Sequence, residues 1–142
     1  MRVVLLENEP DVAVQIKDTL EVAQGMVVEC IYTEYEFRRR IHSLTASPPS
    51  AFVLDVIVDW TEPGVDVCAP IEVVKDGPFY AGVRCYSLLS ADPRTEAIPV
   101  VFYSGCRRSD LDGMITGPIN FLSKDYGDHR ELLRLLEELI RR

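Results

Sequence analysis

Apolar runs of strand length alternate along this chain with segments that carry helical periodicity. The runs are rich in β-branched and aromatic residues and cover about residues 2–7, 26–32, 51–55, 98–104 and 119–124. Alternating strands and helices predict a parallel sheet with helices on both faces. The 142 residues are enough for one compact domain with a real core. We therefore expect an α/β fold: a single doubly wound domain over residues 1–142, built on a five-stranded parallel sheet.

Four of the runs end in residues that carry chemistry. Asp55 closes Ala-Phe-Val-Leu-Asp, Ser104 closes Val-Val-Phe-Tyr-Ser, Lys124 closes Phe-Leu-Ser-Lys, and the first run leads into Glu7-Asn8-Glu9. If the runs are parallel strands, these side chains meet at the carboxyl edge of the sheet, where open α/β folds bind ligands. A carboxylate nucleophile with a cation and hydrogen-bond donors around it suits reversible aspartyl phosphorylation. The pattern predicts a phosphoacceptor switch centred on Asp55.

Helix signals fill the spaces between the strands. Pro10 suits the first turn of a helix that stops at Gly25. Thr33 and Glu36 form a capping box that opens a second helix running to about Leu44. A further helix is predicted over residues 83–89.

The last helix has the clearest pattern. Asp128 and Glu131 are expected to cap it, and Arg141 and Arg142 lie at the negative end of its dipole. Its predicted buried face is formed by apolar residues at helical spacing: Leu132, Leu133, Leu136, Leu139 and Ile140.

Two stretches do not fit the alternation. Residues 57–81 are too long for a strand-to-helix connection, so we interpret them as an insertion. Two short β-rich runs within it, 65–68 and 71–74, predict a small hairpin that projects beside Asp55 and selects partners; a tolerated surface loop is the alternative. Residues 106–118 should hold a helix, but their glycines and proline predict a short, weak one.

The composition limits the class of protein. Fifteen basic and 23 acidic residues give a net charge of −8, which argues against a general nucleic-acid-binding surface. No signal peptide or membrane span is evident, and we expect a cytoplasmic protein. The four widely spaced cysteines favour reduced thiols over disulfides or a metal site: Cys30, Cys68, Cys85 and Cys106.

Together these motifs resemble the receiver domain of two-component response regulators. The resemblance rests on Glu7-Asn8-Glu9-Pro10, Leu54-Asp55, Ser104-Gly105 and Phe121-Leu122-Ser123-Lys124, in that order and spacing. It covers nearly the whole chain apart from residues 57–81. It implies the strand order 2-1-3-4-5.

The resemblance also implies roles. Asp55 would accept the phosphoryl group, Ser104 and Lys124 would contact it, and Ser104 with Phe121 would act as the switch. Mg²⁺ would be bound by Glu7, Asn8 and Asp55. The implied donor is a histidine kinase or phosphotransfer protein. The output would be contact with an unknown protein, because the chain ends at the last receiver helix; a homodimer stays open. Such a module is not an enzyme, although it can assist its own phosphorylation and dephosphorylation.

Three departures favour an alternative, a pseudo-receiver that binds proteins without phosphate chemistry. Asn8 replaces a carboxylate that ligates Mg²⁺ in the family, and one unit charge at 4 Å is worth about 4 kcal/mol at an effective dielectric of 20. Asp125 replaces the proline that usually follows the lysine, so a trans peptide is expected there. The insertion adjoins Asp55. Glu9 or Asp59 could compensate for Asn8.

Other residues have simpler interpretations. His42 and His129 are expected at the surface, and Arg38-Arg39-Arg40 on a solvated helix face. A phosphohydrolase of the haloacid dehalogenase type would need a second Asp where Ile57 stands.

Overall fold

Five parallel strands form one sheet in the order β2-β1-β3-β4-β5, as predicted. This computed structural model describes residues 1–23 and 25–142. The strands are β1 (Arg2–Leu6), β2 (Val27–Ile31), β3 (Ala51–Leu54), β4 (Val100–Ser104) and β5 (Asn120–Ser123). The register pairs Leu6 with Leu54 and Leu54 with Phe102, so the residues that follow β1 and β3 emerge side by side.

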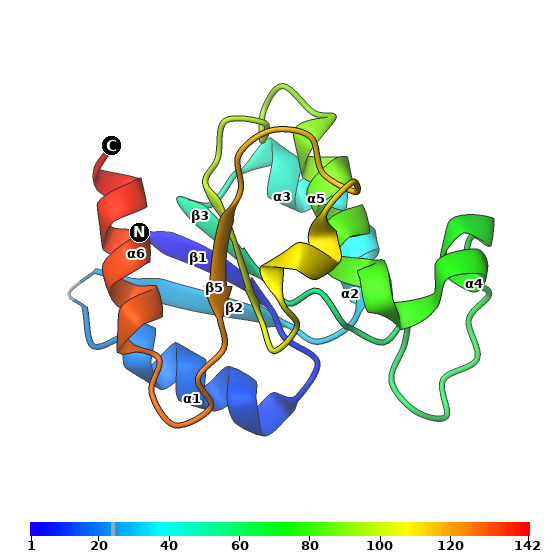
Figure 1. The fold of residues 1–142 in the computed structure, drawn as a ribbon, viewed down its shortest axis with the longest axis horizontal. Coiled ribbons are helices and arrows are strands. Elements are labelled where there is room, and N and C mark those ends of the chain that lie inside the picture. The colour runs from blue at the N-terminus through cyan, green and yellow to red at the C-terminus, as the bar shows by residue number, and fades with distance from the viewer. Residues whose placement is uncertain (24) are drawn as a thin grey trace.

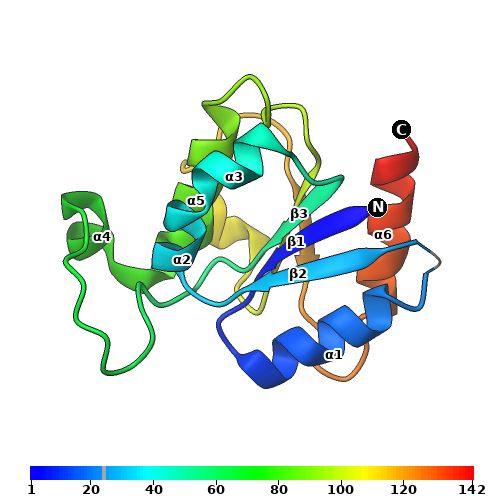
Figure 2. The same ribbon diagram turned by 180° about the vertical axis from the view of Figure 1, so that it is seen from behind.

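Helices cover both faces of the sheet (Figures 1 and 2). One face carries α1 (Pro10–Leu20) and α6 (Arg130–Arg141), and the other carries α2 (Glu34–Arg39), α3 (Ile41–Ala46) and α5 (Ala81–Ser90). The period-2 alternation of the strands divides the core between them. In β1, Val3 and Leu5 pack in one cluster with α1 and α6, while Val4 and Leu6 pack in the other. No helix among residues 1–23 and 25–142 is long and apolar enough to cross a membrane.

The predicted second helix is divided into α2 and α3 at Arg40. Thr33 caps α2 as expected, because its Oγ1 accepts a hydrogen bond from the Glu36 N–H at 3.1 Å. The Glu36 carboxylate accepts from Tyr32 N–H at 3.3 Å and not from the cap residue, so the capping box is incomplete. Arg40 leaves the helical conformation and its guanidinium pairs with Glu29 of β2.

The last helix begins later than the capping box predicts. His129 is its N-cap, and no side chain caps it by a hydrogen bond. Asp128 instead accepts from the N–H and the guanidinium of Arg130 at 2.9 Å. Of the predicted apolar face, Leu132 and Leu136 are fully buried, and Leu133, Leu139 and Ile140 are half-buried.

The hairpin predicted between residues 57 and 81 is wrong. The run 71–74 belongs to a helix, α4 (Ile71–Asp76), and 65–68 is not a strand. Pro70 at the N-cap, Glu72 in the first turn and Gly77 at φ 70° after the last turn are helix signals that outweigh the β-branched residues. A 3₁₀ turn, η1 (Gly77–Tyr80), joins α4 to α5.

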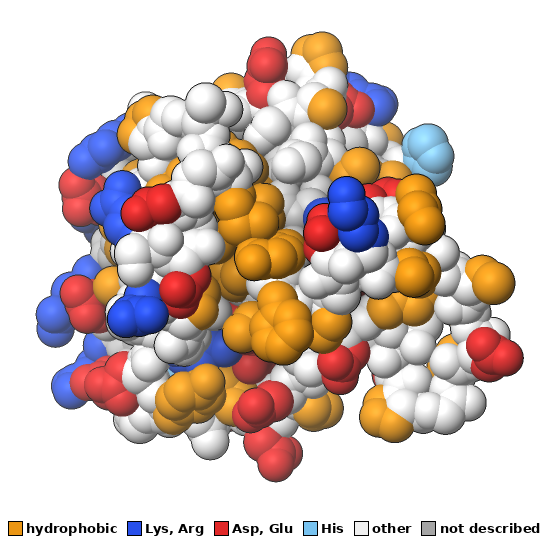
Figure 3. All heavy atoms as spheres, turned by 45° about the vertical axis from the view of Figure 1, so that its right-hand side comes forward, with side chains coloured by type: hydrophobic (Ala, Val, Ile, Leu, Met, Phe, Trp, Pro, Cys, Tyr) orange, Lys and Arg blue, Asp and Glu red, His pale blue; other side chains and the backbone are white. Residues whose placement is uncertain are grey.

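We call residues 61–76 the arm, because they extend away from the sheet in Figure 1. The arm exposes large apolar side chains, including Ile71 at 78% and Val74 at 69%. Hydrophobic side chains reach the surface at several places on the face shown in Figure 3.

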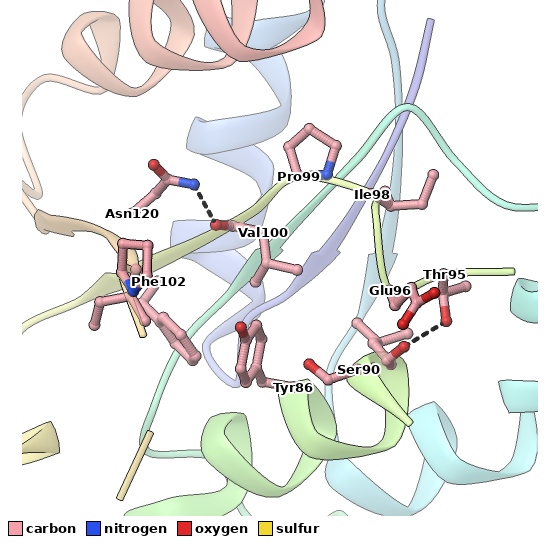
Figure 4. A pocket seen from close by; sticks show the side chains of 12 residues that line it. Tyr86, Ser90, Thr95, Glu96, Ile98, Pro99, Val100, Phe102 and Asn120 are labelled. Atoms are coloured by element: carbon pink, nitrogen blue, oxygen red, sulfur yellow. Dashed lines mark hydrogen bonds between the residues drawn. The ribbon is translucent and has the colours of Figure 1, made fainter. Parts of the chain in front are cut away.

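Residues 106–118 form even less helix than expected. Only the 3₁₀ turn η2 (Arg108–Leu111) is present, and Gly113 and Gly117 have positive φ angles of 80° and 90°. A cavity of about 150 Å³ lies beside this stretch, between α5 and the strands β4 and β5. Figure 4 shows Tyr86 and Ser90 on its helix side and Asn120 on its strand side, where Asn120 donates to the Val100 carbonyl.

Candidate functional site

Asp55 lies at the carboxyl edge of the sheet with Ser104 and Lys124 on its two oxygens. The Ser104 hydroxyl donates to Asp55 Oδ1 at 2.8 Å, and the Lys124 ammonium contacts Asp55 Oδ2 at 2.6 Å. The three residues follow or end β3, β4 and β5, so strand order alone brings them together. Asp55 is buried, with only 8% of the residue exposed. The structure assembles these three predicted residues into one cluster.

Glu7 joins the cluster through Lys124. The Lys124 Nζ lies 2.8 Å from Glu7 Oε2, and both side chains are only 2% exposed. Burial and a hydrogen bond with Asp55 raise the pKa of Glu7 well above its usual value, against the opposing effect of Lys124. Burial lowers the pKa of Lys124, but Asp55 and Glu7 outweigh it and raise the pKa overall. The Lys124 ammonium thus contacts both acidic side chains.

Asn8 is turned partly away from this ion cluster. Its Nδ2 donates to the Tyr32 carbonyl at 3.1 Å, which leaves the amide oxygen as the group that could face an ion. Glu7 and Asp55 offer the oxygen ligands that Mg²⁺ prefers, but the raised pKa of Glu7 means that its side chain holds a proton near neutral pH and brings little charge to an ion. Residues 1–23 and 25–142 contain no group of three His, Cys, Asp or Glu side chains able to hold a metal. The donor set fits a weakly held Mg²⁺ whose charge the protein only partly balances. Glu9 and Asp59, the suggested substitutes, are exposed.

Backbone groups complete the surroundings of Asp55 and Ser104. The Ile57 N–H donates to Asp55 Oδ1 at 3.4 Å, and the Cys106 N–H donates to Ser104 Oγ at 3.3 Å. Gly82 packs so closely that a Cβ there would lie 2.0 Å from the Asp55 carbonyl oxygen. The sequence contained no signal for this contact, because it depends on how α5 docks on the end of β3.

Tyr126 also lies near the site, although it was not among the predicted site residues. Its ring lies 5.5 Å from the Lys124 ammonium, and a Cβ on Gly105 would come within 3.2 Å of its hydroxyl. The Lys124–Asp125 peptide is trans, as expected, since no peptide bond among residues 1–23 and 25–142 is cis.

Phe121, the predicted switch residue, is half-buried. It packs against the core cluster on the α5 side, and the register places it beside Phe102.

The prediction that His129 lies at the surface is wrong. It is 4% exposed and lies 2.6 Å from the Tyr103 hydroxyl, so it is not a surface residue. The helix cap position that it occupies faces the sheet, which a reading of local sequence could not reveal. His42 is exposed, as predicted.

The arginine run is only partly a solvated face. Arg38 and Arg84 both donate to Glu34, which is fully buried, and the Arg84–Glu34 contact is 2.7 Å. Arg38 also pairs with Glu72 of the arm at 3.3 Å and lies 5.9 Å from the Trp60 ring centre. The network joins α2, α5 and the arm.

The cysteines are free thiols, as the spacing predicted. Cys85 is fully buried, which raises the pKa of its thiol, and Cys30 and Cys106 are partly buried. Cys68 is exposed in the arm.

Comparison with known proteins identifies the fold. No protein-family profile and no curated protein matches the sequence. Among solved structures, a sensor protein from Polaromonas sp. JS666 has a TM-score of 0.70 at 17% identity, over 99% of this chain and 95% of that one. A putative response regulator from Chloroflexus aurantiacus gives 0.70 at 17% over 99% and 98%. The fold is that of response-regulator receiver domains.

A third match concerns the metal. The response regulator TrrA from Thermotoga maritima, solved in complex with Mg²⁺-BeF, has a TM-score of 0.68 at 13% identity over 97% of each chain. At these identities the likeness establishes the receiver fold and the five-stranded order.

Proposed function

We propose that this chain is a signalling receiver that is phosphorylated on Asp55. The observation that carries the proposal is the contact of both Asp55 oxygens with groups that can bind a phosphoryl group: the Ser104 hydroxyl and the Lys124 ammonium. A buried carboxylate that only formed a turn would not need contacts from both the Ser104 hydroxyl and the Lys124 ammonium. The receiver fold of the structural neighbours supports the same function.

The proposed reaction uses these contacts. An Asp55 oxygen attacks the phosphorus of a phosphohistidine in line with the leaving imidazole nitrogen. The O–P bond forms as the N–P bond breaks, and the electron pair of the N–P bond stays on the imidazole nitrogen. The imidazole leaves as a neutral ring when its other nitrogen carries a proton. Ser104 and Lys124 then transfer their contacts from the carboxylate to the phosphoryl oxygens. Bound Mg²⁺, held by Glu7, Asn8 and Asp55, would supply further charge neutralisation at these oxygens.

The donor is a histidine kinase or phosphotransfer protein, and the output is contact with another protein. Phosphorylation replaces one negative charge on Asp55 with about two near neutral pH. Ser104 on β4 and Phe121 on β5 carry the response, because Ser104 touches the acceptor and Phe121 packs into the core behind it.

Intact mass spectrometry after incubation with acetyl phosphate and Mg²⁺ tests the proposal. We expect one added phosphoryl group in the wild type and none in Asp55→Asn. Asp18→Asn is the matched control, since Asp18 is an exposed carboxylate on α1, and it should be modified like the wild type. Modification that persists in Asp55→Asn would place the acceptor elsewhere.

The second candidate is the pseudo-receiver. Asn8 favours the pseudo-receiver, because this residue brings no charge to a metal and its amide nitrogen donates to the Tyr32 carbonyl. Failure of the wild type to form any adduct at saturating acetyl phosphate and Mg²⁺ would select this candidate.

A further inference from the structure

A buried tyrosine–histidine pair lies directly behind the candidate site. Tyr103 precedes Ser104 on β4 and is 2% exposed, and its hydroxyl lies 2.6 Å from Nδ1 of His129. The rings meet edge to face with centroids 5.7 Å apart. Tyr103 thus connects the strand that ends in Ser104 to the N-cap residue of α6.

The pair also holds the loop that carries Lys124. The Tyr103 hydroxyl accepts a hydrogen bond from the Asp125 N–H at 3.4 Å, and the Lys124 N–H donates to the Ser104 carbonyl at 2.9 Å. Asp125 closes the next turn, because its side chain accepts from the Gly127 N–H at 3.0 Å. The loop that follows the lysine is therefore fixed from β4 and from α6, at a place where the chain has aspartate and not proline.

The hydrogen bond between Tyr103 and His129 can run in either direction, and we assign the Tyr103 hydroxyl as its donor. The Tyr103 oxygen accepts from Asp125, so its own proton is available to His129 Nδ1, and the imidazole is then neutral with its proton on Nε2. That Nε2 is buried and has no partner within residues 1–23 and 25–142. Burial lowers the pKa of His129 and Lys124 lowers it further, while the carboxylates of Asp125 and Asp128 oppose the shift.

We propose that Tyr103 and His129 are positioning residues that hold Lys124 against Asp55 by fixing residues 124–128, and that they do so while His129 is neutral. Neither residue touches the acceptor; both act through Lys124. The effect on phosphorylation rests on the proposed function, whereas the effect on the loop does not.

Four variants test the pair. Tyr103→Phe removes the hydroxyl, His129→Leu removes the acceptor, and His129→Asn keeps an acceptor near Nδ1 but cannot titrate. The fourth is the double variant Tyr103→Phe/His129→Leu. Tyr86→Phe and His42→Leu are matched controls, because Tyr86 is half-buried on α5 and His42 is exposed.

The first measurement is amide hydrogen exchange at Asp125 and Gly127. We expect Tyr103→Phe and His129→Leu each to speed exchange about fivefold, the usual effect of one net hydrogen bond. The double variant should exchange no faster than either single variant, since the residues act as a unit. His129→Asn should stay within about twofold of the wild type. This measurement needs no phosphorylation.

The second measurement is the phosphorylation rate at saturating acetyl phosphate and Mg²⁺. Tyr103→Phe, His129→Leu and the double variant should each lose about fivefold in the saturated rate, because Lys124 is displaced. The acetyl phosphate concentration at half-saturation should change little, because substrate contacts are kept. The ratio of the wild-type rate to the His129→Asn rate should fall as the pH drops through the His129 pKa.

The outcomes separate the two proposals. If no protein form is phosphorylated, the proposed function fails and amide exchange alone decides the positioning role. Unchanged exchange at Asp125 in Tyr103→Phe, or equal effects of His129→Asn and His129→Leu, would overturn that role. A wild-type to His129→Asn ratio that stays flat with pH would overturn the need for a neutral imidazole.

Discussion

Replacing Gly82 with alanine should displace the acceptor itself. Gly82 lies in the first turn of α5, and its N–H donates to the Val56 carbonyl at 3.0 Å. An added Cβ would lie 2.0 Å from the Asp55 carbonyl oxygen and 2.9 Å from Val56 Cα. Ordinary contacts begin at 3.4 Å, so the helix or the Asp55 backbone must move by more than 1 Å. Both neighbours are backbone atoms and cannot rotate away.

Two opposing effects set the size of the loss. Alanine is favoured over glycine within a helix by about 1 kcal/mol. Overpacking costs about 1–3 kcal/mol, occasionally more, and losing the Gly82–Val56 hydrogen bond costs about 1 kcal/mol. We expect the free energy of unfolding to fall by about 1–3 kcal/mol, measured by urea denaturation. A shift of about 1 Å at a reacting group can cost about 100-fold in rate, so phosphorylation by acetyl phosphate should fall further than stability does.

Ser90→Ala at the exposed end of the same helix is the control and should change stability by less than about 0.5 kcal/mol. The reasoning would be refuted if Gly82→Ala were as stable as the wild type and were phosphorylated at the same rate. Loss of stability with an unchanged rate would show that α5 moves and Asp55 does not.

Four further changes test other parts of the structure. Glu34→Leu should lower the free energy of unfolding by about 3–5 kcal/mol in urea denaturation, because it leaves Arg84 buried without its carboxylate; a loss below about 1 kcal/mol would contradict this. Asn8→Asp should tighten Mg²⁺ binding in calorimetry, and unchanged affinity would mean that Asn8 is not a ligand. Protonating His129 favours the unfolded state, because burial lowers the folded-state pKa. Stability should therefore be complete above the usual histidine pKa and decline as pH falls below it, and His129→Asn should remove that component from urea midpoints. Replacing residues 62–76 by a Gly-Ser linker should leave acetyl phosphate reactivity unchanged but reduce selectivity among purified phosphodonor proteins; equal selectivity would make the arm a tolerated insertion.

The sheet and its site could be predicted because both depend on patterns that the sequence repeats. Each strand is a short apolar run, and β1, β3, β4 and β5 all lead into polar residues at one edge. In a parallel sheet all carboxyl ends lie together, so the meeting of Asp55, Ser104 and Lys124 needs no knowledge of side-chain packing. The connection of Glu7 to Lys124 followed from the same rule.

The remaining features depend on tertiary contacts with no local signal. β-branched residues favoured strands at residues 71–74, but a strand needs a neighbour to bond with, and the arm extends away from the sheet. Glu34 is buried against two arginines, one of them 50 residues away in the chain, and no local pattern indicates this contact. His129 was predicted to be exposed because its partner, Tyr103, lies on another element and leaves no local signal.

The charge balance at the edge of the sheet explains why the position of Lys124 is decisive. Glu7 and Asp55 share one buried ammonium, and Asn8 contributes no charge to draw in a metal. A phosphoryl group on Asp55 would add negative charge where the protein can supply only Lys124 and whatever cation it binds. The Lys124 side chain is 2% exposed, so a phosphoryl group on Asp55 would compete with Glu7 for its ammonium. Its movement is limited by the loop that follows it, and that loop is fixed through Tyr103 to α6. In the proposed function, a phosphoryl group on Asp55 would thereby be connected to α6, on which Glu131, Arg134 and Glu138 are exposed.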